Sequence, residues 1–249
     1  MRADAYLAQN GYFPSRNKAA EAILRGEVIA NGKEIKKPSQ EMNTDDVVEI
    51  SDLAANFASN GGFKLQKAFD DFKLNVENLK CVDVGASNGG FTDCLLRHGA
   101  ARVYAIDVGE NQFSESLAND TRVVVIDNFN ARGLDVDTLG EKVNFATCDV
   151  SFISLTYVLK PIYDVLTDDG AAVVLIKPQF ECGKRQINKN GIVTDEKDRR
   201  NAVEKICDFA VAIGFFVAGV TNAPIKKDKN VEYLAFLKKE KVYESNDFL

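Results

Sequence analysis

Histidine is scarce in this chain of 249 residues, which contains only His98. The stretch from Gly85 to Gly89 matches the G-x-S-x-G turn of serine hydrolases, and such an enzyme needs a histidine base that follows its serine in the chain. His98 lies eleven residues after Ser87, in the helix expected after the turn and about three helical turns from the serine. It cannot return to accept the serine proton, so the sequence argues against a serine hydrolase.

Paired cysteines and long apolar runs are missing as well. The five cysteines are scattered without a C-x-x-C pair, which argues against a disulfide framework or a zinc site and favours reduced, mostly buried thiols. The longest apolar run, 209–220, is shorter than the roughly 20 residues that cross a bilayer. Instead it predicts the end of a helix that stops at Gly214, followed by a buried strand. Because the start also lacks the order of a signal peptide, we expect a cytoplasmic protein without metal or membrane span. The sequence does not indicate an oligomeric state.

Positive charge is not in excess, since the net charge is −6, and this argues against a generally basic nucleic-acid binder. Two stretches are nevertheless locally basic: residues 16–37 and residues 184–200 each contain six basic and three acidic side chains. Such patches can neutralise RNA phosphates, although the first could also be an ordinary solvated helix face. The second is expected to form a long loop beside the site. The expected RNA contacts are Arg2, Arg16, Lys18, Arg25, Lys33, Lys36, Lys37, Lys184 and Arg185.

The chain divides into two compositional parts. Residues 1–55 predict a small α+β domain with a helix that begins after Ser15 and ends at Gly26, and a hairpin turn at Asn31-Gly32. Small polar residues then predict a linker at 56–61. Residues 62–249 alternate short β-branched runs with helical stretches, which predicts an α/β fold with a Rossmann-like, mostly parallel sheet and helices on both faces.

The turn in "VDVGASNGGF", residues 82–91, predicts a cofactor site. Ser87 occupies the third position of G-x-G-x-x-G, where its side chain would crowd a pyrophosphate, and no Gly-Lys-Ser/Thr follows, so a dinucleotide and a phosphate loop are disfavoured. A cofactor with nucleoside and amino-acid parts but no phosphate remains, namely S-adenosyl-L-methionine. Asp107 ends the next strand, 22 residues after Gly85, at the separation where an acid binds both ribose hydroxyls.

Two charged residues end apolar strands further along the chain. Asp149 ends "NFATCDV" and Lys177 ends "VVLIK", and a charge placed there loses hydration and needs a partner. A structural salt bridge between the two would satisfy this need. The alternative is a cluster with Lys64 and Glu232 that orients a ribose 2′-hydroxyl and helps to remove its proton, with Lys177 as base or as electrostatic steerer.

Longer stretches carry a family resemblance. Residues 2–40 resemble the alpha-L RNA-binding motif, and "GGFKLQKAF", "CDVSFISL", "IKPQFE" and "NVEYL" resemble the hemolysin A (TlyA) family, whose catalytic domain is FtsJ-like. The resemblance implies 2′-O-methylation of ribosomal RNA, typically at cytidine, by an S-adenosylmethionine-dependent enzyme whose partners are ribosomal RNA or ribosomal subunits. It implies a catalytic tetrad of Lys64, Asp149, Lys177 and Glu232. The implied cofactor contacts are Asp83, Gly85, Ala86, Ser87, Gly89, Gly90, Phe91, Asp107, Asn128 and Asp149.

Two departures and two other functions accompany this resemblance. "VIDNFNAR" differs from the family's usual stretch ahead of its Asn-Ala-Arg, so the resemblance does not fix the adenine-side roles of Asp127, Asn128 and Asn130. The family's "SRGG" is "SNGG" here, so Asn60 stands where an arginine is expected. A cytolytic protein of the haemolysin type is an alternative, but the sequence contains neither a membrane span nor a clear amphipathic pore-forming helix. An RNA-binding protein with a silent methyltransferase fold is the other, and the intact tetrad argues against it.

Overall fold

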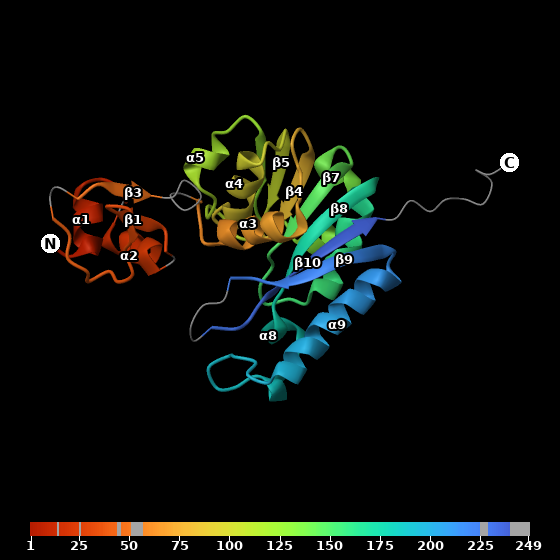
Figure 1. Ribbon diagram of the computed structural model, residues 1–249. Helices are drawn as coiled ribbons and strands as arrows, with labels where there is room; N and C mark the ends of the chain where they lie inside the picture. The colour runs from red at the N-terminus through yellow and green to blue at the C-terminus, as the bar shows by residue number, and fades with distance from the viewer. Residues whose placement is uncertain (14, 25, 44–45, 51–56, 225–228, 240–249) are drawn as a thin grey trace. The chain divides into compact units, whose positions relative to one another are not determined.

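The structure, a computed structural model, describes residues 1–13, 15–24, 26–43, 46–50, 57–224 and 229–239. It divides into two compact units, Met1–Phe57 and Ala58–Leu249, which are described separately (Figure 1). Residues 58–61, expected in the linker, are part of the second unit: the Ala58 N–H donates to Asp93 Oδ2 at 2.8 Å, and a helix begins at Gly61. Residue 56 of the predicted linker lies outside the described residues.

The first unit packs two helices against a small antiparallel sheet. Its strands are ordered β2-β1-β3, and its core gathers apolar side chains from both layers, among them Leu7, Ile23 and Val28. The elements are α1 (Ala3–Gln9), α2 (Arg16–Leu24), β1 (Val28–Ala30), β2 (Lys33–Glu34) and β3 (Val48–Ile50).

Local signals for this unit are confirmed. Ser15 Oγ accepts a hydrogen bond from the Lys18 N–H at 3.3 Å at the start of α2, and Gly26 follows the helix with φ +78°. Asn31 and Gly32 have φ values of 51° and 73°, as a two-residue hairpin turn with left-handed residues requires. They join β1 to β2 as predicted.

The second unit is built on a seven-stranded sheet of order β6-β5-β4-β7-β8-β10-β9. The five strands from β6 to β8 are parallel, whereas β10 is antiparallel to both of its neighbours. The predicted α/β fold with a mostly parallel sheet is confirmed. The strands are β4 (Lys80–Val84), β5 (Arg102–Ile106), β6 (Val123–Ile126), β7 (Val143–Cys148), β8 (Leu166–Ile176), β9 (Phe215–Asn222) and β10 (Tyr233–Lys239).

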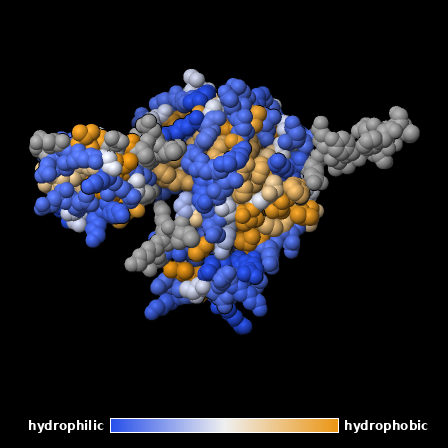
Figure 2. Space-filling view, in the orientation of Figure 1, coloured by the Kyte–Doolittle hydropathy of each residue, from blue (hydrophilic) through white to orange (hydrophobic). Residues whose placement is uncertain are grey.

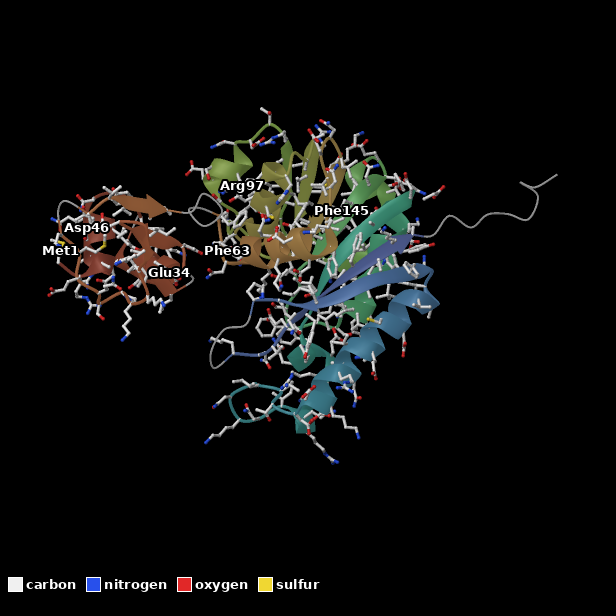
Figure 3. The ribbon with its side chains drawn as sticks, viewed as in Figure 1. Met1, Glu34, Asp46, Phe63, Arg97 and Phe145 are labelled. Carbon is white, nitrogen blue, oxygen red and sulfur yellow. The ribbon has the colours of Figure 1, made fainter. Side chains whose placement is uncertain are left out.

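Helices cover both faces of this sheet (Figure 1). Val82 and Val84 of β4 share a core with α7 and α9, while Asp83 between them points to the opposite face, where Thr92 of α4 binds it. Helix α3 contacts α4, β9 and β10, and Phe63 of α3 and Arg97 of α4 are labelled in Figure 3. The helices are α3 (Gly61–Phe72), α4 (Gly90–Arg97), α5 (Glu115–Ala118), α6 (Val136–Leu139), α7 (Leu159–Val165), α8 (Pro178–Glu181) and α9 (Glu196–Ala212), with short 3-10 turns η1 (Ala131–Gly133), η2 (Leu155–Tyr157) and η3 (Lys184–Gln186).

The scarce residues have structural roles. The five cysteines are free, and burial raises the pKa of Cys81 and of Cys148 to about 12, so these thiols stay protonated at neutral pH. His98 follows α4, stacks on Phe69 with ring centroids 3.8 Å apart, and forms a hydrogen bond with Gln66 at 2.9 Å. Among the described residues, no helix is long and apolar enough to span a membrane.

Candidate active site

One edge of the second unit's sheet collects the predicted site residues. Each of four predicted residues directly follows the carboxyl end of a parallel strand: Gly85 follows β4, Asp107 follows β5, Asp149 follows β7 and Lys177 follows β8. Open α/β sheets bind ligands at this edge. Since β10 is antiparallel to β8, with Tyr233 opposite Ile176, the start of β10 lies at this same edge.

The turn after β4 needs a glycine for two reasons. Gly85 has φ +84°, a conformation that costs a residue with a side chain about 1–2 kcal/mol. A Cβ atom on Gly85 would also lie 2.8 Å from the carbonyl oxygen of Asp149, which is closer than unstrained packing permits. The turn therefore lies directly against the backbone that follows β7, and this contact sets the position of Asp149.

Asp107 is held over the same turn by the backbone. One carboxylate oxygen accepts the Ser87 N–H and the other accepts the Gly109 N–H, both at 2.7 Å. A carboxylate has about four acceptor positions, so two remain for a ligand with paired hydroxyl groups.

A cavity of about 560 Å³ opens beside Asp107. Its walls combine apolar side chains, which suit a flat nucleobase, with Asp107, which suits a ribose. The nucleoside part of S-adenosylmethionine fits this donor set. The apolar lining residues include Ile106, Val108, Phe129, Ala131, Ile153 and Val158.

A second cavity, of about 240 Å³, shares part of its wall with the first. Gly85, Ser87, Asp149 and Ser151 line both cavities. Gly90 also lines the second cavity. A Cβ there would lie 2.2 Å from Ser59 Oγ and 3.0 Å from the Gly62 nitrogen of α3, so the start of α4 lies close against the start of α3. The remaining lining residues are Ser59, Asn60, Gly61, Lys64, Ala86, Gly90, Phe91 and Lys177.

Three of the four predicted catalytic residues, Lys64, Asp149 and Lys177, line this second cavity, and the fourth, Glu232, joins them through an ion pair with Lys64. Lys177 Nζ lies 2.5 Å from Asp149 Oδ1, and Lys64 Nζ lies 3.8 Å from Asp149 Oδ2 and 2.7 Å from Glu232 Oε2. The side chains are 9–20% exposed. Two ammonium and two carboxylate groups thus compensate each other's lost hydration, while a face of the cluster stays open to the cavity.

Three residues expected at the cofactor lie elsewhere. Asp83 is fully buried beneath Thr92 and Thr147, whose hydroxyls donate to it at 2.7 and 2.8 Å. Gly89 faces Phe113 and Leu117, and the Asn128 amide donates to Glu110 at 2.8 Å. None of the three lines either of the two cavities. The other predicted cofactor residues line at least one of the two cavities; they are Gly85, Ala86, Ser87, Gly90, Phe91, Asp107 and Asp149.

The burial of Asp83 predicts a pH-dependent stability. Burial raises the pKa of Asp83 to about 6 from 3.8, while the hydrogen bonds from the two threonines act in the opposite direction. The folded state therefore holds this proton more tightly than the unfolded chain, and the resulting stabilisation is present below pH 3.8 and is lost as the pH rises through about 6.

Urea denaturation of the wild type and of Asp83→Asn measures this effect. The wild type should lose about 2 kcal/mol of unfolding free energy relative to the variant between pH 4 and pH 7. A difference that stays constant with pH would contradict the assignment.

Ser151 and Phe152 are among the lining residues that the sequence did not indicate. Ser151 lines both cavities and accepts a hydrogen bond from Lys177 Nζ at 2.8 Å. Phe152 lines the larger cavity, has φ +64° and is 90% exposed, with its ring 5.2 Å from that of Phe180. Both residues closely follow Asp149 in "CDVSFISL", and this closeness to a predicted catalytic residue could have indicated them from the sequence.

The residues expected to bind RNA are mostly exposed. Arg2 and Arg16 share Asp4, whose pKa is lowered to about 2 chiefly by the hydrogen bond from Arg2, and Lys18 lies 3.6 Å from Glu21. Arg25 lies outside the described residues. The remaining residues of the set are exposed, namely Lys33, Lys36, Lys37, Lys184 and Arg185.

The second basic stretch is more ordered than expected. It was predicted as a long loop, but residues 184–186 form η3 and residues 196–200 form the first turns of α9, because Asp195 caps that helix by accepting the Lys197 N–H at 2.7 Å. The surface in this region is largely hydrophilic (Figure 2).

Comparisons with known proteins decide the family. A model described as FtsJ-like methyltransferase matches residues 57–239, and a model described as S4 domain matches residues 1–48. The chain belongs to the FtsJ-like methyltransferase family. It is an enzyme that uses S-adenosylmethionine, as the sequence predicted, and its first unit is an S4 domain.

Similar proteins extend over nearly the whole chain. Hemolysin A of Brachyspira hyodysenteriae is 43% identical over 241 residues, which are 94% of this chain and 98% of that protein. The 16S/23S rRNA (cytidine-2′-O)-methyltransferase TlyA of Mycobacterium tuberculosis is 39% identical over 239 residues, 95% of this chain and 89% of that protein. The solved structure named "Putative hemolysin from Streptococcus thermophilus" is 38% identical, covers 97% of this chain and 89% of that chain, and superposes with a TM-score of 0.72. The resemblance to the TlyA family is thereby confirmed.

Proposed function

We propose that this FtsJ-like enzyme transfers the methyl group of S-adenosylmethionine to the 2′-hydroxyl of a cytidine in ribosomal RNA. The observation that carries the proposal is the ion-paired cluster of Lys64, Asp149, Lys177 and Glu232. Its first three members line a cavity that shares a wall with the nucleoside-sized one. The name of the Mycobacterium tuberculosis relative and the S4 domain support this substrate. The expected location is the cytoplasm, where ribosomal RNA is found.

In this proposal the larger cavity holds the nucleoside of the donor through Asp107 and the Gly85–Ser87 turn. When bound, the donor supplies an electrophilic methyl group on its sulfonium sulfur. The smaller cavity receives the ribose of the acceptor. Cofactor and acceptor then meet at the wall that Asp149 and Ser151 share between the two cavities.

Lys177 and Asp149 orient the acceptor hydroxyl. Lys177 already reaches Asp149 and Ser151, and an ammonium group has three donors, so its third N–H is available for the 2′-oxygen. Asp149 Oδ2 accepts the hydroxyl proton in this proposal, because the ammonium group of Lys64 lies 3.8 Å from this oxygen and leaves it able to accept a hydrogen bond. Much of the acceleration comes from holding the hydroxyl in line, which can contribute about 7–11 kcal/mol.

Methyl transfer to isolated ribosomal particles tests the function. Purified protein is incubated with methyl-labelled S-adenosylmethionine and with 30S subunits, 50S subunits or free ribosomal RNA, and the 2′-O-methylated riboses are mapped. The RNA substrate is one that does not already carry the modification. We expect the label on the ribose of a cytidine. Label on a base, or no label on any particle, would contradict the proposal, and the latter would favour a silent RNA-binding protein.

Phe152 is expected to bind the acceptor nucleotide. Phe152 follows Ser151, which lines both cavities, and its ring lies at the larger cavity but is 90% exposed. The exposed ring offers a stacking surface to a base of the acceptor RNA outside that cavity, and base stacking on an aromatic side chain contributes about 1–3 kcal/mol. Phe152→Ala should therefore raise the KM for RNA by about 5- to 150-fold. The control is Phe216→Ala, which removes a 49% exposed ring on β9. Equal KM values for the two variants would exclude the stacking role.

The lysines of the S4 domain are expected to contact phosphates. Lys33, Lys36 and Lys37 are exposed, and each phosphate contact adds about 0.7–0.9 to the slope of log K against log salt. The triple alanine variant should bind RNA more weakly with a slope smaller by about two to three, while calorimetry gives an unchanged affinity for S-adenosylmethionine. An unchanged slope would remove these lysines from the interface.

A further inference from the structure

A buried carboxylate near the tetrad takes no part in the mechanism above. Glu181 ends α8, four residues after Lys177, and its side chain is only 1% exposed. An ionised carboxylate in such a place needs several donors to replace the water it has lost. The hydrogen-bond donors that surround Glu181 show which parts of the molecule it connects.

The partners of Glu181 come from two other segments. Oε2 accepts a hydrogen bond from Ser154 Oγ at 2.6 Å, and Oε1 accepts the Leu155 N–H at 2.8 Å. From α9, Lys205 Nζ lies 3.2 Å from Oε2 and also donates to the backbone carbonyl of Glu181 at 3.0 Å. One carboxylate thus joins the segment after β7, the segment after β8 and α9.

These contacts form a second connection between two segments that the tetrad already joins. At the cavity, Lys177 Nζ meets Asp149 and Ser151. Further along both segments, Glu181 meets Ser154 and the following N–H. A single connection leaves the two segments free to turn about it, whereas two connections fix both their separation and their direction.

We propose that Glu181 is a positioning residue for methyl transfer, which sets the distance between Lys177 Nζ and Asp149 by bracing the segments that carry them. The effect on rate rests on the proposed function, whereas the effect on the Lys177–Asp149 distance does not. Glu181 itself touches neither of the two cavities, so its action passes through the two segments.

Glu181→Ala and Glu181→Gln separate positioning from folding. The alanine variant should lower kcat by about 10²-fold, because a misplacement of about 1 Å can have this effect, with the KM for RNA changed less than kcat. The glutamine variant should recover part of the activity. Its amide oxygen can accept the Leu155 N–H and its amide nitrogen can donate to Ser154 Oγ, whereas Lys205 Nζ loses its contact with Oε2 and keeps only the one to the backbone carbonyl.

The matched control is Val165→Ala, which removes buried methyl groups from α7 and should lower the melting temperature without changing kcat per folded molecule. All variants are assayed at a temperature where melting curves show them folded. A Glu181→Ala variant that loses stability but keeps its kcat, as the control does, would overturn the positioning role.

Crystal structures of the wild type and Glu181→Ala supply a readout that does not require methyl transfer. The distance from Lys177 Nζ to Asp149, 2.5 Å here, should lengthen beyond ion-pair range in the variant, and an unchanged pair would overturn the proposal. A displaced pair together with a wild type that methylates no RNA would defeat the proposed function and leave the brace supported.

Ser154→Ala keeps the proposal testable if Glu181→Ala fails to fold. This variant removes one hydrogen bond of the second connection and retains the one to Leu155. It should lower kcat by about 5- to 10-fold, the equivalent of about 1.0–1.4 kcal/mol. An unchanged kcat would overturn the brace.

Discussion

Lys177→Met is expected to lower the rate of methyl transfer by about 10²- to 10³-fold, the effect of removing one preorganised donor from a reacting oxygen. Methionine keeps the length of the side chain but removes the ammonium group, which lies 2.5 Å from Asp149 and donates to Ser151. Lys177 does not line the larger cavity, so the affinity for S-adenosylmethionine should change little. Single-turnover transfer of labelled methyl and calorimetry with the cofactor measure the two effects separately.

Lys160→Met is the matched control for this variant. Lys160 is an exposed lysine of α7 that pairs with Asp164, four residues along the same helix, and its loss should leave the rate unchanged. Comparable rates for the two variants would show that the ammonium group of Lys177 does not act on the reaction.

Gly85→Ala is expected to damage both the fold and the site. The added Cβ would lie 2.8 Å from the Asp149 carbonyl oxygen at φ +84°, so the strained backbone and the displaced neighbour should together lower the unfolding free energy by about 2–4 kcal/mol. Because Asp149 must move with its backbone, the transfer rate of folded protein should fall by about 10²-fold. Urea denaturation and single-turnover kinetics measure the two quantities.

Gly140→Ala isolates the backbone strain from the steric contact. Gly140 has φ +77°, but a Cβ there would meet nothing within 4 Å. Its substitution should therefore lower the unfolding free energy by only about 1–2 kcal/mol and leave the transfer rate intact. If Gly85→Ala behaved in the same way, the turn would not be what positions Asp149.

The sequence predicted the parts of the site that depend on strand ends. Asp107, Asp149 and Lys177 each follow a short β-branched run, and parallel strands bring their carboxyl ends to one edge, so their proximity follows from local pattern and sheet direction. Glu232 was different, because its position depends on β10 running antiparallel to β8. The sequence analysis and the family resemblance both included Glu232 in the cluster, but no strand-end pattern predicts where it lies.

Other site features depend on tertiary contacts that no local pattern encodes. Val82 and Val84, on either side of Asp83 in β4, face the α7 core, whereas Asp83 faces Thr92 and lines neither cavity. The exposure of Phe152 depends on a left-handed backbone that the sequence does not signal, since such a conformation is uncommon for residues other than glycine. The partners of Glu181 come from segments 26 and 24 residues away.

The arrangement of two cavities around one shared wall is tested most directly by a crystal structure of the protein with S-adenosylhomocysteine. The account predicts the ribose of this ligand on Asp107, its adenine among the apolar residues of the larger cavity, and its sulfur facing the smaller cavity where Lys177 and Asp149 remain paired. A ligand bound elsewhere, or a bound structure in which the side chains of Lys64, Asp149, Lys177 and Glu232 lie apart, would contradict it.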